Sequence, residues 1–526
     1  MLAFVAAWKI KGTPVKLYKN LILVGCSALA LAGCGSDDIA SPGTGGNVTI
    51  TNTTTPTTPT TPVDNSVKAA SGCPTIADPQ GLKDDGTITG PTGTWRVCTL
   101  PARINKSITL AKIPGLLYQM AGRVDVGTDG GFTKTSADSN VTLTIEPGVI
   151  VYGGTGVSWL AVNRGNKISA VGTAARPIVF TSRDNVLGLN TETSQGQWGG
   201  VVLMGRARIT DCGSGSTTAN TCERPTEGSA DPANYGGIDD ADNSGQMSYV
   251  QIRYSGYVLG ADKELQSLTT EGVGSATKLD HIMSYNSSDD GAEFFGGNVN
   301  MKYYVSVGAD DDSFDADTGL TGNFQYGLLI QRAGAGDALM EIDSNGNESQ
   351  NPRQTLKISN FTGIQAQVSS NSEANDLASI LIRGNADVTL ANSVIFTPNN
   401  ECLRLNGSGA TPATLTARSV VLTCNATKYL GSGTYNAAAT ATAFGAGSNG
   451  NSDSFVSTLT NVFINGANEL AAAVFDVTGL GAFFTATTHI GAVKDSNDTW
   501  TAGWTCNSGA ANFGSTSTAC TSLPTT

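Results

Sequence analysis

A repeat of 22 residues in the middle of the chain constrains the fold more than any other feature. The strand-like runs His281–Tyr285 and Tyr303–Val307 are each followed, at the same distances, by a group of acidic residues. The acids that coincide under this offset are Asp289 with Asp311, Asp290 with Asp312, and Glu293 with Asp315. A fixed period of roughly 20–50 residues is the signature of stacked repeats. Stacked β-coils lie about 4.8 Å apart, so the pattern predicts that these carboxylates lie directly above one another.

Short β-runs separated by Pro-Gly and Gly-Thr turns fill the region before this repeat. Their apolar residues alternate in pieces of four or five, which is typical of strands buried on one face. The clearest runs are Leu143–Tyr152, Trp159–Val162, Lys167–Gly172 and Pro177–Phe180. Three short strands per turn resemble a right-handed parallel β-helix, an all-β solenoid whose coils bury their inner faces against one another. Later runs continue the theme less regularly: Ala378–Ile382, Val388–Leu390, Ser393–Phe396, Leu415–Ala417 and Val456–Phe463.

The N-terminus resembles the signal of a bacterial lipoprotein. A lysine-rich start precedes the apolar stretch Leu21–Ala32, which is too short to span a bilayer. The run Leu31–Cys34 resembles a lipobox. This resemblance implies that residues 1–33 are removed and that Cys34 carries the lipid, including acyl chains such as palmitate. The alternative is a chance cysteine in a cleaved secretory signal or in an N-terminal anchor helix.

The lipoprotein resemblance also implies a location and a domain order. Gly35 and Ser36 lack the aspartate associated with inner-membrane retention, which favours a lipid anchor in the bacterial outer membrane, on its periplasmic or cell-surface face. Residues 34–68 are rich in Thr and Pro and predict an extended linker. Residues 69–526 then form the β-helix domain, with a less regular C-terminal part.

Charge and cysteine content agree with an exported protein. The chain has 44 acidic and 31 basic side chains, a balance that repels nucleic acid and attracts divalent cations. Eight cysteines after Cys34 fall into pairs close in sequence: Cys73 with Cys98, Cys212 with Cys222, Cys402 with Cys424, and Cys506 with Cys520. We expect these pairs to form disulfides, since the short loops suit successive coils. A zinc site would need C-x-x-C pairs or nearby histidines, and the chain has only His281 and His489.

Three segments resemble a group of bacterial β-helix surface lipoproteins, mostly of uncharacterised function. They are Gln197–Leu203, Gly245–Gly256 and Asp289–Gly297. The resemblance covers about residues 140–335 well and the last third weakly. It implies architecture and location, and it identifies no catalytic residue.

The acidic repeat is the strongest chemical feature. Stacked carboxylates repel one another unless they are protonated or bridged by a cation, and Ca²⁺ accepts six to eight oxygen ligands. We therefore predict calcium at a set of acids in the two coils and in the loop Asp240–Gly245. The candidate ligands are Asp289, Asp290, Glu293, Asp310, Asp311, Asp312, Asp315, Asp317, Asp240 and Asp242. A similar loop, Asp343–Glu348, also spaces its oxygen ligands at alternate positions. The alternative is that these acids only cap backbone amides in turns.

These features favour a membrane-tethered binding or structural module with calcium-stabilised turns, without catalytic activity. Its acidic loops would face a glycan or a neighbouring surface protein. The rival hypothesis is a calcium-dependent polysaccharide lyase or hydrolase, in which Lys302 or Arg332 acts beside the acids. A groove that places either base next to the acids would favour the rival. The sequence contains no phosphate-binding Gly-rich loop, no G-x-S-x-G and no H-E-x-x-H.

Overall fold

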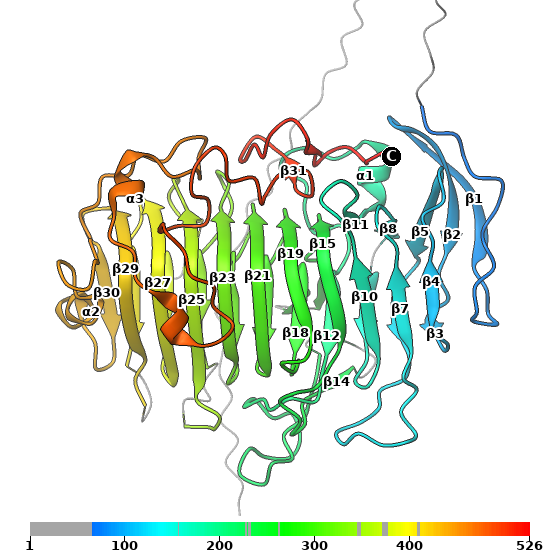
Figure 1. Cartoon of the computed structure of the whole chain (residues 1–526). Coiled ribbons are helices and arrows are strands. Elements are labelled where there is room, and N and C mark those ends of the chain that lie inside the picture. The colour runs from blue at the N-terminus through cyan, green and yellow to red at the C-terminus, as the bar shows by residue number, and fades with distance from the viewer. Residues whose placement is uncertain are drawn as a thin grey trace, which may run out of the picture. The chain divides into compact units, whose positions relative to one another are not determined.

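The computed structural model describes residues 66–526 except 156, 227–228, 230–232, 261–262, 345–348, 371–376, 408–410 and 526. The predicted signal 1–33, Cys34 and nearly all of the linker 34–68 lie outside the described residues. The unit Asn65–Thr526 is a column of coils built from two large sheets (Figure 1). Neighbouring strands in both sheets run parallel, except for an antiparallel hairpin at the N-terminal end.

The larger sheet has 15 strands and the smaller has 11. The larger contains β1 (Lys83–Gly90), β2 (Gly93–Thr99), β4 (Ile108–Leu110), β5 (Leu116–Met120), β7 (Thr142–Ile145), β8 (Ile150–Gly153), β10 (Lys167–Val171), β11 (Ile178–Ser182), β15 (Gly245–Arg253), β19 (Lys278–Tyr285), β21 (Asn298–Val307), β23 (Thr321–Ile330), β25 (Gln354–Ile364), β27 (Ala386–Thr397) and β29 (Thr414–Cys424). The smaller contains β3 (Arg103–Ile104), β6 (Arg123–Val126), β9 (Trp159–Val162), β12 (Val201–Met204), β18 (Leu268–Glu271), β20 (Ala292–Phe295), β22 (Asp315–Asp317), β24 (Met340–Ile342), β26 (Ile380–Ile382), β28 (Leu403–Asn406) and β30 (Tyr429–Ser432).

Each long strand of the 15-stranded sheet is bent at one residue in the left-handed region. The first half of β15 pairs with β10 and its second half with β11, and Tyr249 (φ 53°) lies at the bend between them. The equivalent positions on later coils are His281, Tyr303, Tyr326, Asn360, Asn392 and Ser419, all with positive φ. Left-handed backbone is rare for residues other than glycine, so its recurrence marks a corner built into every coil. Each coil therefore consists of three short strands, as the sequence predicts.

The interior of the column is a continuous apolar stack. Ala292 and Phe294 of β20 point inward, and the ring of Phe294 lies 5.1 Å from Phe314 and 5.2 Å from Phe324 between ring centroids. The prediction of an all-β parallel β-helix is confirmed. The expected runs between residues 143 and 180 correspond to the strands β7, β8, β9, β10 and β11.

Both ends of the column are covered by other elements. At the N-terminal end the segment before β1 packs Ala70, Cys73, Ile76 and Leu82 against the core. At the other end, α2 (Ala437–Phe444) packs on β29 and β30 and buries Phe444 in the core. The remaining short elements are α1 (Arg183–Leu187), α3 (Ala467–Ala471), the 3₁₀ helix η1 (Val477–Leu480), and the strand pairs β13 (Arg224–Pro225) with β14 (Asn234–Tyr235), β16 (Val258–Gly260) with β17 (Lys263–Glu264), and β31 (Cys506–Asn507) with β32 (Thr518–Ala519).

After α2 the chain turns back along the outer face of the 15-stranded sheet (Figure 1). We call residues 445–526 the return segment. Side-chain amides of four coils donate to its backbone: Asn392 to Phe475 O, Asn360 to His489 O, Gln325 to Thr485 O and Gln251 to Trp504 O. The predicted strand Val456–Phe463 is wrong, because this run belongs to the return segment, where Val456 is exposed and no coil continues.

All four expected disulfides are present: Cys73–Cys98, Cys212–Cys222, Cys402–Cys424 and Cys506–Cys520. Within the described ranges, none of the helices combines the length and apolarity needed to cross a membrane.

Candidate metal-binding site

The outer face of the 11-stranded sheet carries a column of carboxylates. Strand side chains alternate between faces, so the inward Ala292 and Phe294 place Glu293 outside. Asp315 and Asp317 flank the inward Ala316 on the next strand in the same way. The register pairs Glu293 with Asp315 and Asp315 with Glu341 on three successive strands. The predicted stacking of Glu293 on Asp315 is therefore present in the structure.

The turns that lead into these strands hold a second set of acids. Asp289 and Asp290 precede β20, while Asp310, Asp311 and Asp312 precede β22. Backbone amides tie these turns together. The amide of Asp312 donates to Oδ1 of Asp290 at 2.9 Å, and Oδ1 of Asp312 accepts from the amide of Ala338 at 2.7 Å. Gln266 donates to Oδ2 of Asp289 at 2.8 Å.

Three overlapping groups of acids have ligand oxygens within 4.8 Å of one another. They are Asp289, Asp290 and Asp311; Asp290, Glu293 and Asp315; and Asp311, Asp312 and Asp337. Two groups share Asp290 and two share Asp311. We call these seven residues the carboxylate cluster. Hard divalent cations prefer such a set of oxygen ligands.

Burial and mutual repulsion raise the pKa values of five acids in this cluster, which are Asp289, Asp290, Glu293, Asp312 and Asp315. Burial is the main cause for Asp290, followed by the charges of Asp289 and Asp315. For Glu293, burial comes first and the charges of Asp315 and Asp317 come next. Burial also raises the pKa of Asp315 to about 7, although a hydrogen bond from Glu293 opposes the rise. The metal-free cluster therefore retains protons at pH values where exposed carboxyls have lost them.

At Glu341, the far end of this column of acids, a basic side chain lies beside the carboxylates. Arg383 lies 3.3 Å from Glu341 and 2.8 Å from Asp343, which partly neutralises this end. Asp317 lies between the two parts, and its buried Oδ1 accepts no hydrogen bond. The pKa of Asp317 is raised, first by burial and then by Asp315 and Asp343. One buried carboxylate oxygen beside the cluster is thus available to a cation.

Besides Asp317, three other predicted ligands lie outside these groups. Asp310 accepts a hydrogen bond from Gln195. Asp240 pairs with Arg208 at 2.5 Å, and Asp242 accepts from the amide of Arg206 at 2.9 Å. An arginine and a backbone amide contact the carboxylates of Asp240 and Asp242, and these two acids belong to none of the three groups, so their role as metal ligands stays a prediction. Part of the similar loop Asp343–Glu348 lies outside the described residues.

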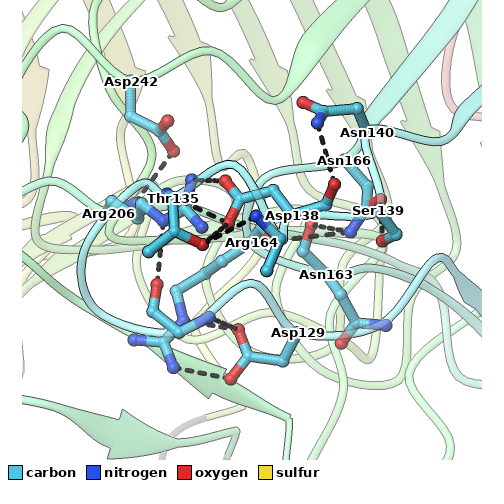
Figure 2. A network of polar contacts seen from close by, with 12 residues as sticks. Asp129, Thr135, Asp138, Ser139, Asn140, Asn163, Arg164, Asn166, Arg206 and Asp242 are labelled. Atoms are coloured by element: carbon cyan, nitrogen blue, oxygen red, sulfur yellow. Dashed lines mark hydrogen bonds and ion pairs between the residues drawn. The ribbon is translucent and has the colours of Figure 1, made fainter.

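Asp242 belongs to a buried polar network at the neighbouring corner of the column (Figure 2). Arg164 donates to both oxygens of Asp129 and lies 2.6 Å from Glu223, while Arg206 lies 2.8 Å from Asp138. Burial raises the pKa of Asp138, but hydrogen bonds and charge from Arg206 together with Thr135 outweigh it, so the net pKa is lowered. This network anchors loops that pack beside the 11-stranded sheet.

The two candidate bases are separated from the carboxylate cluster. Lys302 lies on β21, in the other sheet, where its ammonium is 3.5 Å from Thr485 and 4.9 Å from the Phe483 ring centroid. Arg332 follows β23 and donates to Gln195, which in turn donates to Asp310. Neither residue has a described contact with Asp290, Glu293 or Asp315, so the geometry gives the lyase hypothesis no base beside the acids.

Several large aromatic side chains of the column are buried and are therefore not available to stack on a sugar: Trp159, Trp198, Tyr254, Phe294, Phe295 and Tyr304. Sequence reasoning also missed Asp337 and Glu341. The spacing from Asp315 to Glu341 departs from the 22-residue period, so the offset does not find them. The alternation of apolar and acidic residues in Met340-Glu341-Ile342 is the sequence signal that could have identified Glu341 as an acid on the outer face.

A family model described as a pectate-lyase like beta helix domain matches residues 132–505. This range contains the carboxylate cluster and most of the return segment. No curated protein and no solved structure matches the chain.

Proposed function

Because the chain belongs to the family of pectate-lyase like beta helix domains, we propose that its column serves as a binding module that holds Ca²⁺ in the carboxylate cluster. The family is compatible with binding modules and with polysaccharide-active enzymes. The proposal further places the module at the bacterial outer membrane, tethered through a lipid on Cys34, where it meets a glycan or another surface protein. The resemblance of Leu31–Cys34 to a lipobox supports the tether.

The overlap of the three acid groups is the observation that carries the calcium proposal. A single acid group is common at a turn, but here Asp290 and Asp311 each belong to two groups. Asp290 and Glu293 are buried, and their raised pKa values have burial and neighbouring acids as the leading causes. Such a set is stable only when protons or a cation compensate its charge. Calcium supplies that compensation at neutral pH and accepts this number of oxygens.

The ligand chemistry favours calcium over softer metals. The acid groups contain only carboxylates, whereas zinc and copper prefer sites with histidine or cysteine. All eight described cysteines are in disulfides, which agrees with an exported chain in a calcium-rich setting. Calcium would then hold the turns of three successive coils in place.

Calorimetric titration of the purified chain with CaCl₂, together with thermal unfolding in calcium and in chelator, tests the proposal. We expect saturable binding and a higher unfolding midpoint in calcium. A calcium concentration about 100 times the Kd would add about 2.7 kcal/mol to the free energy of unfolding. Asp290→Asn should weaken binding, while the matched control Asp240→Asn should not, since Asp240 pairs with Arg208 outside the cluster. Equal midpoints in calcium and in chelator would contradict the proposal.

A second candidate, polysaccharide hydrolysis, is favoured by one observation. Glu293 and Asp315 are hydrogen-bonded to each other, and both pKa values are raised mainly by burial. Glycoside hydrolysis uses one protonated and one ionised carboxyl about 5–9.5 Å apart, so this hydrogen-bonded pair would have to separate to admit a sugar. Release of reducing ends from acidic polysaccharides, abolished in both Glu293→Gln and Asp315→Asn, would support this candidate. Unsaturated products would instead indicate a lyase.

A further inference from the structure

A groove lies on the outer face of the 15-stranded sheet, where β10, β15 and β19 are neighbours. Its volume is about 210 Å³, below the range of roughly 300–1,000 Å³ that is usual for drug-sized ligands, so it suits a small chemical group. The register places Ser169, Gln246 and Lys278 side by side on the three strands. Lys167, two residues before Ser169 on β10, projects from the same face.

The groove is basic, although the chain as a whole is acidic. Lys167 and Lys278 both line it, and both are exposed. Among the residues that the structure describes, the lining contains no acid, and neither lysine has an ion pair. Asp280, two residues after Lys278, lies outside the lining and is bonded to Ser248 and His281 at 2.5 and 2.6 Å. Two ammonium groups without a carboxylate partner attract an anion to this groove.

The groove is open where the rest of this face is covered. Further along the sheet, Lys357 and Lys302 contact oxygens of the return segment at 2.7 and 3.5 Å. The return segment lies in front of β25 and passes above β10 and β15 (Figure 1). Gly245 leaves space in the groove, since it has no side chain and a Cβ there would lie 1.9 Å from the backbone oxygen of Ile168. An anion therefore has access to Lys167 and Lys278.

The donors of the groove fit a phosphate group better than a carboxylate. A phosphate monoester carries a charge of about −1.5 to −2 near pH 7 and has three acceptor oxygens. A carboxylate carries a single charge on two oxygens. Lysine binds phosphate as a point charge. The hydroxyls of Thr142 and Ser169 and the amide of Gln246, which donates to Ser169 at 3.1 Å, add neutral donors beside the two ammonium groups.

We infer that this groove binds a phosphate monoester. Lys167 and Lys278 would compensate its charge, while Ser169 and Gln246 would donate hydrogen bonds to its oxygens. The phosphate belongs either to a soluble ester or to the headgroup of a lipid, because the recognised group is the same in both. The site does not require calcium, since none of its residues belongs to the carboxylate cluster.

Phosphorus NMR of glycerol 3-phosphate and of inorganic phosphate, titrated with the full chain after removal of divalent cations, tests the inference. We expect saturable line broadening that added NaCl weakens, because exposed charges are screened by salt. Lys167→Gln and Lys278→Gln should each weaken binding about fivefold, or about 1 kcal/mol, which is the attraction between two exposed unit charges in water. Lys278→Arg keeps the charge and should retain most of the affinity.

The matched control is Lys494→Gln, which removes an exposed lysine of the return segment outside the groove. It should bind phosphate as the unchanged chain does. Galacturonate offers a carboxylate in place of the phosphate and should compete only weakly. The inference is overturned if neither phosphate binds, if both groove variants bind as tightly as the unchanged chain, if the control loses as much affinity as they do, or if galacturonate binds as tightly as glycerol 3-phosphate.

Flotation with vesicles distinguishes the two sources of the phosphate. Vesicles of phosphatidylcholine are compared with vesicles that also contain phosphatidic acid, whose headgroup is a phosphate monoester. A lipid on Cys34 would act on both vesicles alike, so only the difference reports on the groove. A larger bound fraction with phosphatidic acid, lost in Lys167→Gln and Lys278→Gln, supports the inference with a lipid headgroup as ligand. Equal fractions together with binding of glycerol 3-phosphate support it with a soluble ester as ligand.

Discussion

Glu293 and Asp315 lie opposite each other on the neighbouring parallel strands β20 and β22, with both carboxyls on the outer face of the 11-stranded sheet. Burial raises both pKa values, and the two groups share a hydrogen bond. The pair therefore holds a proton when no metal is present. When that proton dissociates, two carboxylate oxygens of the pair become free to bind a cation.

Replacing Glu293 with Gln should change stability in opposite directions with and without calcium. In chelator at neutral pH the folded chain keeps Glu293 protonated, because burial and then Asp315 and Asp317 raise its pKa. Holding this proton costs stability that the neutral Gln does not lose, so the free energy of unfolding should rise by about 1 kcal/mol. In calcium it has lost a ligand, and a tenfold weaker affinity removes about 1.4 kcal/mol of the stabilisation by calcium, which outweighs that rise, so the free energy of unfolding should fall. Denaturant unfolding of both proteins in chelator and in calcium measures these two opposite changes in free energy. A change of the same sign in both would contradict a metal role for Glu293.

Metal-free stability should fall as the pH rises from about 4 to about 7. The folded-state pKa of Asp315 is about 7, raised mainly by burial from the ordinary value of 3.8. The folded state therefore binds more protons than the unfolded state in this window, and this stabilisation is complete below the unfolded pKa. Each such proton contributes a slope of about 1.4 kcal/mol per pH unit. Urea melts in chelator should show the fall, and saturating calcium should remove it.

Gly291→Ala should destabilise the coil that carries the acids. A Cβ at this position would lie 2.3 Å from Oγ of Ser306 and 2.6 Å from the backbone oxygen of Ser313. Because the backbone at Ser313 cannot yield freely, we expect a loss of about 1–3 kcal/mol. Gly479→Ala is the matched control, since nothing lies within 4 Å of its Cβ position, and it should change stability by less than about 0.5 kcal/mol. Thermal unfolding in calcium measures the stability of both variants against that of the unchanged chain.

Arg253→Met should release the C-terminal end of the chain. The buried guanidinium donates to the backbone oxygens of Cys520 and Ser522, both at 2.8 Å. Methionine keeps much of the volume but leaves these carbonyls unpaired, at about 1–3 kcal/mol each. Limited carboxypeptidase digestion should shorten the variant faster than the unchanged chain. The exposed Arg176→Met is the control, and an equal rate in all three proteins would contradict the anchoring role.

The sequence predicts the parts of the structure that depend on local periodicity. Alternation of two residues identifies the strands, and the offset that aligns Glu293 with Asp315 reproduces their register. The path of the return segment could not be predicted, because its contacts join residues far apart, such as Gln251 with Trp504. The pairing of Asp240 with Arg208 is of the same kind, because the two residues lie in different loops.

The path of the return segment has a consequence for how this column comes apart. In a simple solenoid each coil contacts only its neighbours, so coils at one end are able to fray independently. Here Asn392 near one end and Arg253 nearer the other are bonded to the same continuous stretch of chain. If a coil at either end unfolds and releases the return segment, coils that are not its neighbours also lose their contacts with that segment. The column should therefore unfold in one cooperative transition and not coil by coil.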